Sequence, residues 1–363
     1  MLPIIPMLPI PHATASKEPP PLSEPAKSQC AKKARLSAAT RTKDTSMKTR
    51  KIGSLEVTIV GLGCNNFGWR IDAAATAAVV NAALDAGINF FDTADIYGKG
   101  QSEEYLGRAL GARRSQIILA TKFGMNMDDQ RHGAKPAYIR QAVEDSLRRL
   151  GTDHIDLYQL HRPDPETPIQ DTLGALDELV KAGKVREIGC SNFTIEQLRE
   201  AEGAVNEAES AVKSGAARFV SVQNAYSILH REPEPGVLPE CSPAGLAFLP
   251  FFPLANGLLT GKYRPSKAPP AGSRAEAGFG PKVFTEENLA IVEKLIQFAD
   301  SRGHSILELA FRWLLTRPEI PSVIAGAKSA EQVKSNVAAG SSDWNLTAAE
   351  LEEINQITSH SPH

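Results

Sequence analysis

The sequence predicts an α/β protein: a (β/α)8 TIM barrel with an N-terminal β-hairpin and a disordered N-terminal tail. Two observations predict this fold. Short apolar runs alternate with longer amphipathic segments, and the alternation repeats eight times over roughly 300 residues. Such repetition gives parallel strands joined by right-handed crossovers, and eight units of this length fit a barrel. The chain is therefore divided into a tail over residues 1–47 and a barrel domain over residues 48–363.

The predicted strands are short apolar runs that end at polar residues or glycines. A hairpin is expected over Arg50–Val57, with Gly53-Ser54 as its turn. The barrel strands are expected at Ile59–Gly63, Ile88–Asp92, Ile117–Lys122, Ile155–His161, Glu187–Cys190, Phe219–Asn224, Ala247–Phe252 and Ser322–Gly326.

Segments with an amphipathic pattern between the strands predict helices. These are Ala73–Ala86, Ser102–Leu110, Pro136–Leu150, Pro168–Ala182, Thr194–Ser214, Glu286–Arg317, Ala330–Ala338 and Thr347–Ile357. The predicted N-caps are Asp72, Ser102 and Thr347, and the glycines expected to end helices are Gly87, Gly151 and Gly183.

An open, doubly wound sheet is the alternative fold. Such a sheet normally carries a glycine-rich phosphate-binding turn after its first strand. Here the turn begins Gly61-Leu62-Gly63, but the place of the third glycine is taken by Asn66. A phosphate loop before Lys262 is also excluded, because its leading glycine is replaced by Asn256. The pattern therefore favours the barrel.

Residues 1–47 lack a periodic apolar face and are rich in Pro, Ser, Ala, Lys and Thr. A segment of this composition does not bury enough apolar surface to offset the entropy lost on ordering. Three interpretations stay open: a disordered tail, a transit peptide, or an artefact of start-site choice, since Met47 opens the segment that looks folded. The prolines, with Glu18 and Glu24, argue against the transit peptide.

Composition excludes several classes of protein. A net charge of -2 gives no basic excess for nucleic acid. The most apolar stretch, Pro243–Leu259, holds three prolines and two glycines, so no membrane span is expected. The four cysteines are scattered singly, which predicts neither a metal site nor a disulfide framework and fits a cytoplasmic protein.

Four ionisable side chains fall at or just after consecutive strand ends, where barrel enzymes carry their catalytic groups. They are Asp92, Tyr97, Lys122 and His161. Each alone has a structural interpretation: a cap, a half-buried phenol, a solvated lysine, or a histidine bonded to a loop carbonyl. Together, an acid, a phenol, an amine and an imidazole on neighbouring strands indicate a catalytic site.

These residues lie in motifs that resemble the aldo-keto reductase family. The motifs are FDTADIYG (91–98), ATKFG (120–124), LHRPD (160–164), GCSNF (189–193), QN (223–224), PL (253–254), GLLTGKY (257–263) and GAKS (326–329). The resemblance runs from about Met47 to the C-terminus, with the motifs in the family's order. It is closer to the bacterial and potassium-channel-β-subunit-like branches than to the mammalian aldose-reductase branch.

The resemblance implies an NADPH-dependent oxidoreductase that reduces aldehydes or ketones to alcohols, with a small-molecule carbonyl substrate and no metal. Tyr97 would be the general acid. A free tyrosine has a pKa of about 10, and the Lys122 cation would lower it. Asp92 would hold Lys122 charged, and His161 would position the carbonyl oxygen. The alternative is a cofactor-binding regulatory subunit of the channel-β type with little turnover.

The cofactor-binding residues implied by the resemblance run from the nicotinamide end to the adenine end of the site. They are Asp92, Ser191, Asn192, Gln223, Phe251, Pro253, Leu254, Lys262, Arg274, Gly326, Lys328, Gln332 and Asn336. Gln332 stands where strongly NADPH-selective members commonly have an arginine, and Phe252 replaces a usual small serine. Trp69 and Phe123 are either walls of the substrate site or packing residues. The substrate and the oligomeric state stay open.

Overall fold

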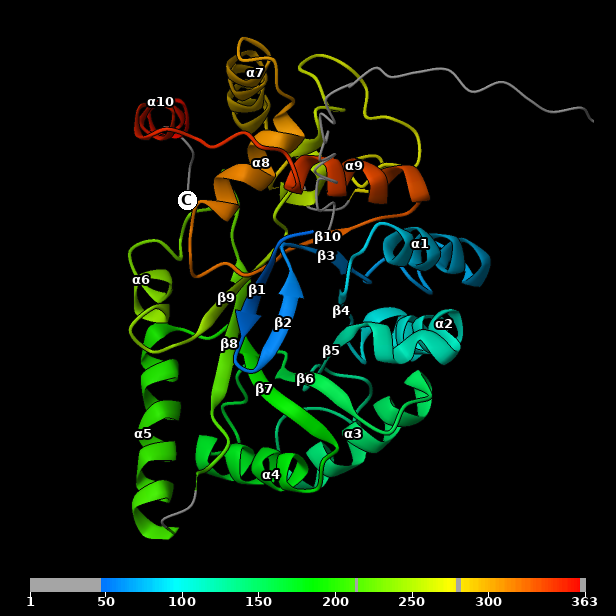
Figure 1. The fold of residues 1–363 in the computed structure, drawn as a ribbon, viewed down its shortest axis with the longest axis vertical. Coiled ribbons are helices and arrows are strands. Elements are labelled where there is room, and N and C mark those ends of the chain that lie inside the picture. Colours follow the sequence, from blue (N-terminus) through cyan, green and yellow to red (C-terminus); the bar gives the residue numbers. More distant parts are fainter. Residues whose placement is uncertain (1–46, 213–214, 279–281, 360–363) are drawn as a thin grey trace, which may run out of the picture. The chain divides into compact units, whose positions relative to one another are not determined.

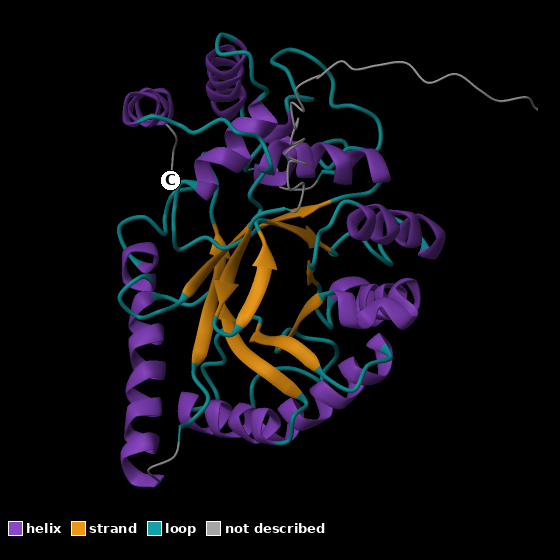
Figure 2. Ribbon diagram, in the orientation of Figure 1, coloured by secondary structure: helices purple, strands orange, loops and turns teal. Residues whose placement is uncertain are grey.

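The computed structural model describes residues 47–212, 215–278 and 282–359. The predicted tail, apart from Met47, lies outside the described residues. The part described is built around eight parallel strands with helices outside them, which confirms the predicted barrel (Figures 1 and 2). The strands are β3 (Val60–Gly63), β4 (Phe90–Asp92), β5 (Ile118–Phe123), β6 (Ile155–Leu160), β7 (Val185–Ser191), β8 (Phe219–Ala225), β9 (Ala247–Phe251) and β10 (Val323–Gly326).

The barrel is nearly closed. Hydrogen-bonded neighbours follow the order β10-β3-β4-β5-β6-β7-β8-β9, so chain order and spatial order agree from β3 to β9. At the seam, the backbone N–H of Phe248 in β9 donates to the carbonyl of Glu319, which precedes β10, over 2.8 Å. All the barrel strands run parallel, so their C-terminal ends meet at one rim.

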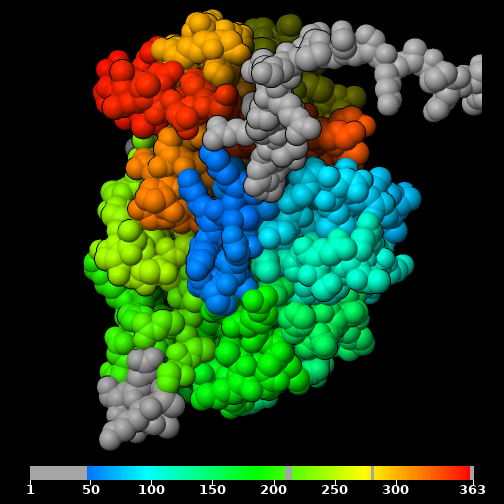
Figure 3. All heavy atoms as spheres, viewed as in Figure 1, coloured from blue at the N-terminus to red at the C-terminus, as the bar shows by residue number. Residues whose placement is uncertain are grey.

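The predicted hairpin is present and covers the opposite rim (Figures 1 and 3). It consists of β1 (Thr49–Ile52) and β2 (Leu55–Thr58), which pair antiparallel around Gly53-Ser54. Gly53 has φ +54°, and a Cβ there would lie 2.8 Å from a carboxylate oxygen of Glu187 and 2.9 Å from Val220, so this turn favours glycine. The apolar side chains of the hairpin pack on the residues that fill the lower barrel: Phe90, Ala120, Leu157, Ala247, Leu249 and Ile324.

Helices lie between the strands and after them. They are α1 (Ala73–Asp85), α2 (Gln101–Leu110), α3 (Pro136–Leu150), α4 (Ile169–Lys181), α5 (Ile195–Val212), α6 (Val237–Cys241), α7 (Glu286–Asp300), α8 (Ile306–Leu315), α9 (Ala330–Gly340) and α10 (Ala348–Thr358), with 3-10 turns η1 (Tyr97–Gly100), η2 (Gly111–Gln116) and η3 (Ala255–Thr260). In the described ranges, no helix combines the length and apolar character needed to cross a membrane.

The long helix predicted over residues 286–317 is wrong, because the structure has two helices there. Gly303, with φ +76°, follows α7. Ser305 then caps α8: its hydroxyl accepts from the backbone N–H of Glu308 over 3.2 Å, and the Glu308 carboxylate accepts from the backbone N–H of Ser305 over 2.9 Å. This reciprocal capping box starts a new helix although the amphipathic pattern continues across the break.

The predicted N-cap at Ser102 is also wrong. Helix α2 begins one residue earlier, after Gly100 in a left-handed conformation. The Ser102 hydroxyl points into the protein instead and donates to the carbonyl of Cys64 over 2.9 Å. The caps at Asp72 and Thr347 are confirmed by their bonds to backbone N–H groups. The three expected helix-ending glycines all have positive φ.

Candidate active site

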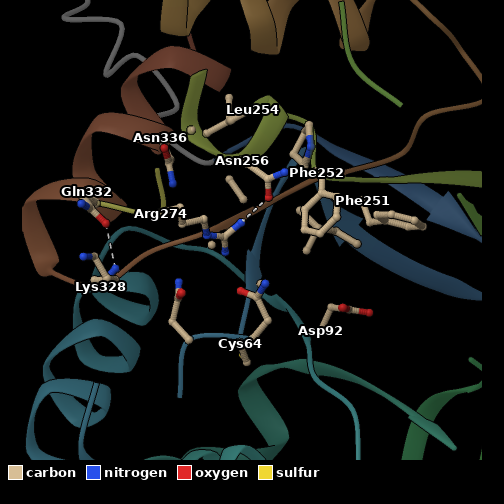
Figure 4. Close-up of a pocket in the computed structure, with 18 of the residues that line it drawn as sticks. Cys64, Asp92, Phe251, Phe252, Leu254, Asn256, Arg274, Lys328, Gln332 and Asn336 are labelled. Atoms are coloured by element: carbon tan, nitrogen blue, oxygen red, sulfur yellow. Dashed lines mark hydrogen bonds between the residues drawn. The ribbon is translucent and has the colours of Figure 1, made fainter. Parts of the chain in front are cut away.

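A cavity of about 570 Å³ opens at the C-terminal rim of the barrel (Figure 4). Asp92 lies at one end of the view, Lys328, Gln332 and Asn336 lie at the other, and Arg274 lies between them. The cavity brings together most of the residues that the sequence singled out. Those that line it are Asp92, Tyr97, His161, Ser191, Asn192, Gln223, Phe251, Pro253, Leu254, Lys262, Arg274, Gly326, Lys328, Gln332 and Asn336.

Lys122 lies behind the lining with no exposed surface. Its Nζ donates to Oδ1 of Asp92 over 2.6 Å and to the carbonyl of Thr93 over 2.8 Å. Strands β4 and β5 are neighbours, which places the two side chains in contact. Burial is the largest single influence and acts to lower the pKa of Lys122, but the charge of Asp92, the Tyr97 phenol and the hydrogen bond to Asp92 together outweigh it, so the pKa lies above the ordinary lysine value. Lys122 is therefore a fixed cation.

The second oxygen of Asp92 is held by two amides. Oδ2 accepts from the side chain of Gln223 over 3.0 Å and from that of Gln159 over 3.2 Å. Gln159 lies in β6 with no exposed surface, and sequence reasoning missed it. The available signal was a glutamine two residues before His161, in the strand that leads to the predicted site. A buried polar side chain needs a partner, and here the partner is the carboxylate that orients Lys122.

The Tyr97 ring lies above the ammonium group, with Lys122 Nζ 5.3 Å from the ring centroid. Burial raises the pKa of the phenol, Lys122 lowers it, and Asp92 raises it again, so the pKa lies above the ordinary value. The sequence correctly predicted the direction in which Lys122 acts. It was wrong about the resulting pKa. Burial destabilises the phenolate more strongly than the Lys122 ammonium, which is itself paired with Asp92, stabilises it. At neutral pH the phenol keeps its proton.

His161 follows β6, and its ring meets the Tyr97 ring edge-on, with centroids 5.8 Å apart. Burial and the nearby Lys122 lower the pKa of His161 to about 3. The imidazole is therefore neutral at physiological pH. Its Nδ1 is buried and has no hydrogen-bond partner in the described part of the chain. His161 also lines the cavity, and a neutral imidazole beside a phenol suits recognition of a small polar group such as a carbonyl.

The ends of β7 and β8 hold the predicted amide-binding residues in one network. Ser191 Oγ donates to the carbonyl of Gln223 over 2.7 Å. The Asn192 amide donates to the carbonyl of His161 over 2.9 Å, and Asn192 has φ +60°. This left-handed conformation turns the chain across the rim, so that Asn192 joins the strand ends of β6 and β7.

Aromatic side chains flank the same end of the cavity. The rings of Phe251 and Phe252 meet edge-on with centroids 5.2 Å apart, and Phe252 is 43% exposed. Phe123 is fully buried and stacks on Tyr158, with centroids 4.7 Å apart, so it is a packing residue. Trp69 is 51% exposed.

Four cations surround the middle and far end of the cavity: Arg70, Lys262, Arg274 and Lys328. In the described ranges, none of them forms an ion pair with an acidic side chain. The Arg274 guanidinium donates to the Asn256 side chain over 3.0 Å. Arg70 was missed in the sequence, where it is one arginine in a loop without a motif. The arrangement suits an anionic ligand.

Comparison with known proteins agrees with this geometry. The model of the aldo/keto reductase family matches residues 59–359. Aldo-keto reductase YhdN of Bacillus subtilis is 36% identical over 314 residues, covering 84% of this chain and 90% of that protein. The Schizosaccharomyces pombe protein named aldo-keto reductase yakc, NADP(+), is 34% identical over 321 residues, covering 86% and 91%. The structure of a glycerol dehydrogenase from Gluconobacter oxydans superposes with a TM-score of 0.73 at 31% identity, covering 86% and 95%. With the eight-stranded barrel and the buried Lys122–Asp92 pair at its rim, these matches place the chain in the aldo/keto reductase family.

Proposed function

We propose that this protein is an NADPH-dependent carbonyl reductase that converts aldehydes or ketones to alcohols. One observation carries the proposal: a protonated phenol lies over a fully buried lysine that an aspartate holds charged, with a neutral imidazole at the side of the phenol. This set offers a proton donor, a cation behind it, and a second hydrogen-bonding group at one point of the cavity rim.

The lining of the cavity fits a nicotinamide dinucleotide, which supplies a hydride when bound. Asp92 is the one acid among the described lining residues, and it is already paired with Lys122. The four cations therefore leave a net positive cavity, which favours the additional phosphate of NADPH over NADH. The relative from Schizosaccharomyces pombe carries NADP(+) in its name, which agrees with this choice.

Each part of the cavity has a role in this proposal. Phe251 would lie against the nicotinamide ring, since it is an aromatic residue of the cavity lining. Ser191, Asn192 and Gln223 would bind the carboxamide beside it. The remaining assignments are Pro253, Leu254 and Gly326 along the cavity wall, Lys262 and Arg274 at the pyrophosphate, Lys328 at the ribose phosphate, and Gln332 and Asn336 at the adenine.

The reacting carbonyl oxygen would sit between Tyr97 and His161. Negative charge develops on that oxygen as the carbonyl carbon is reduced, and the Tyr97 hydroxyl transfers its proton there. Lys122 stabilises the phenolate that is left, and Asp92 keeps Lys122 charged and directed at the ring. His161, neutral at the working pH, holds the oxygen in position.

The proposal is tested by following NADPH absorbance with a panel of aldehydes and ketones. We expect many turnovers per enzyme molecule with at least one carbonyl, and weaker saturation with NADH than with NADPH. Oxidation of a single equivalent of cofactor, with no steady-state rate for any carbonyl, would instead fit the regulatory subunit.

A further inference from the structure

Two cations of the cavity lining, from neighbouring strand ends, meet at one backbone carbonyl. Arg70 follows β3 and Lys328 follows β10, and these strands are hydrogen-bonded neighbours in the barrel. The Arg70 guanidinium and the Lys328 ammonium each donate to the carbonyl of Gly272 over 2.8 Å. Both side chains line the cavity, so the pair is open to whatever binds there.

The pair carries two positive charges, and no ion pair with an acidic side chain is formed by either of them in the described part of the chain. A single carbonyl dipole does not offset two charges. Burial lowers the pKa of Lys328, and among the charges that lower it further Arg70 acts most strongly, ahead of Lys262 and Arg274. Holding like charges this close raises the energy of the free protein. A dianion between them would remove that repulsion.

Helix α9, which begins after Lys328, places no second cation in the described lining of the cavity, because its lining residues are Gln332, Ser335 and Asn336. Gln332 is neutral, and its side-chain oxygen accepts from the backbone N–H of Lys328 over 2.8 Å. Arg70 therefore supplies, from another strand end, a second positive charge that the lining residues of α9 do not provide. Figure 4 shows Lys328 and Gln332 together at the end of the cavity away from Asp92.

We propose that Arg70 is a cofactor-specificity residue that binds, together with Lys328, the phosphomonoester on the adenosine ribose of NADPH. The inference rests on the proposed function, because it assumes that the adenosine end of the dinucleotide lies at Lys328. It adds a residue from the neighbouring strand end, so selectivity for the phosphorylated cofactor depends on the ends of both β3 and β10. On binding, Arg70 and Lys328 exchange the Gly272 carbonyl for phosphate oxygens, which are stronger acceptors.

Adenosine 2′,5′-bisphosphate and 5′-AMP distinguish binding of the 2′-phosphate from a purely structural role of Arg70. The two probes differ only in the 2′-phosphate, and neither carries a hydride. Calorimetric titration would measure both probes on the full chain, for the wild type, Arg70→Gln and Arg70→Lys. The matched control is Lys267→Gln, which removes one charge from an exposed position outside the cavity. Melting temperatures verify that each variant is folded.

We expect Arg70→Gln to weaken the bisphosphate about tenfold, the lower end for a charge-assisted bond, because Arg70 is only partly buried. The affinity for 5′-AMP should stay within about twofold of the wild type, because this probe lacks the 2′-phosphate that Arg70 would bind. Arg70→Lys should recover part of the loss, and Lys267→Gln should change neither probe.

Two results would overturn the inference. Equal losses for both probes would mean that Arg70 only holds the Gly272 segment in place. An unchanged affinity for the bisphosphate would place the phosphate elsewhere. A wild-type protein that binds both probes equally would instead contradict the proposed preference for NADPH, so failure of the proposed function is seen before any Arg70 variant is measured.

Discussion

Lys122 carries a positive charge with no access to solvent, and among the described residues its one acidic partner is Asp92. Lys122→Met keeps the bulk of the side chain and removes the charge beneath Tyr97. We expect the reduction rate to fall by about 10²–10⁴-fold, as when a general acid is impaired. Stability should fall as well, by about 3–5 kcal/mol, because a buried carboxylate is left unpaired.

The double variant Lys122→Met/Asp92→Asn is the matched control, since it removes both charges. It should recover much of the lost stability in urea unfolding and none of the activity. Recovery of activity in the double variant would show that Lys122 serves only to neutralise Asp92.

His161 is expected to stay neutral over the working pH range. Its pKa is lowered to about 3, chiefly by burial. The imidazole should therefore show no titration between pH 5 and 8 by NMR, and the pH profile of carbonyl reduction should carry no step from it. A chemical-shift midpoint near pH 6.5 would show that water reaches the ring and that the positioning role needs revision.

At the scale of single elements, the capping box at the start of α8 can be tested by a single substitution. Ser305→Ala removes the hydroxyl that accepts from Glu308. We expect a loss of about 1 kcal/mol in the free energy of unfolding by urea. Glu308→Gln keeps a side-chain acceptor for the Ser305 backbone N–H, so it should cost less. Equal stability of Ser305→Ala and the wild type would mean that Gly303 alone separates α7 from α8.

The helices and strands also show which elements the sequence pattern could predict and which it could not. The short apolar runs correctly predicted the barrel strands, because a strand that is buried on both faces reads as a continuous apolar run. The hairpin was also correctly predicted. The prediction failed at residues 286–317, where the apolar pattern continues in phase while the backbone breaks at Gly303. Ser102 looked like a cap, but Gly100 starts the helix earlier and the hydroxyl turns inward to Cys64.

The same contrast holds for the site. Asp92, Tyr97, Lys122 and His161 were predictable because the ends of parallel strands meet at one rim. Gln159 and Arg70 were not, because their partners are 67 and 202 residues away in the chain and no motif marks them. The raised pKa of Tyr97 also could not be predicted from the sequence, because it depends on burial that only the folded structure defines.

For the whole molecule, one buried acid outside the cavity links stability to pH. Asp95 is 1% exposed, and in the described residues neither of its carboxylate oxygens has a hydrogen-bond partner. Arg149, the nearby cation, is already paired with Glu103 over 2.6 Å. Burial and the Glu103 charge raise the pKa of Asp95 from 3.8 to about 7. The folded protein thus keeps a proton on Asp95 that the unfolded chain has lost.

This proton stabilises the folded state at low pH, and its contribution is lost as pH rises from about 4 to about 7. Over this pH range, Asp95 alone changes the free energy of unfolding by roughly 4 kcal/mol. Asp95→Asn mimics the protonated acid, so urea unfolding should find it close to the wild type at pH 4 and more stable than the wild type at pH 8. A difference between the two proteins that does not change with pH would contradict the buried, protonated state.

The most direct test of the account is Tyr97→Phe, which removes the proton donor and keeps the ring over Lys122. Stopped-flow reduction of an accepted aldehyde should measure the variant under saturating NADPH, with cofactor affinity and melting temperature as controls. The account predicts a rate lower by about 10²–10⁴-fold at unchanged cofactor binding, and little further loss when Lys122→Met is added, because the lysine acts through the phenol. A folded, NADPH-saturated Tyr97→Phe protein that reduces the aldehyde at the wild-type rate would contradict it.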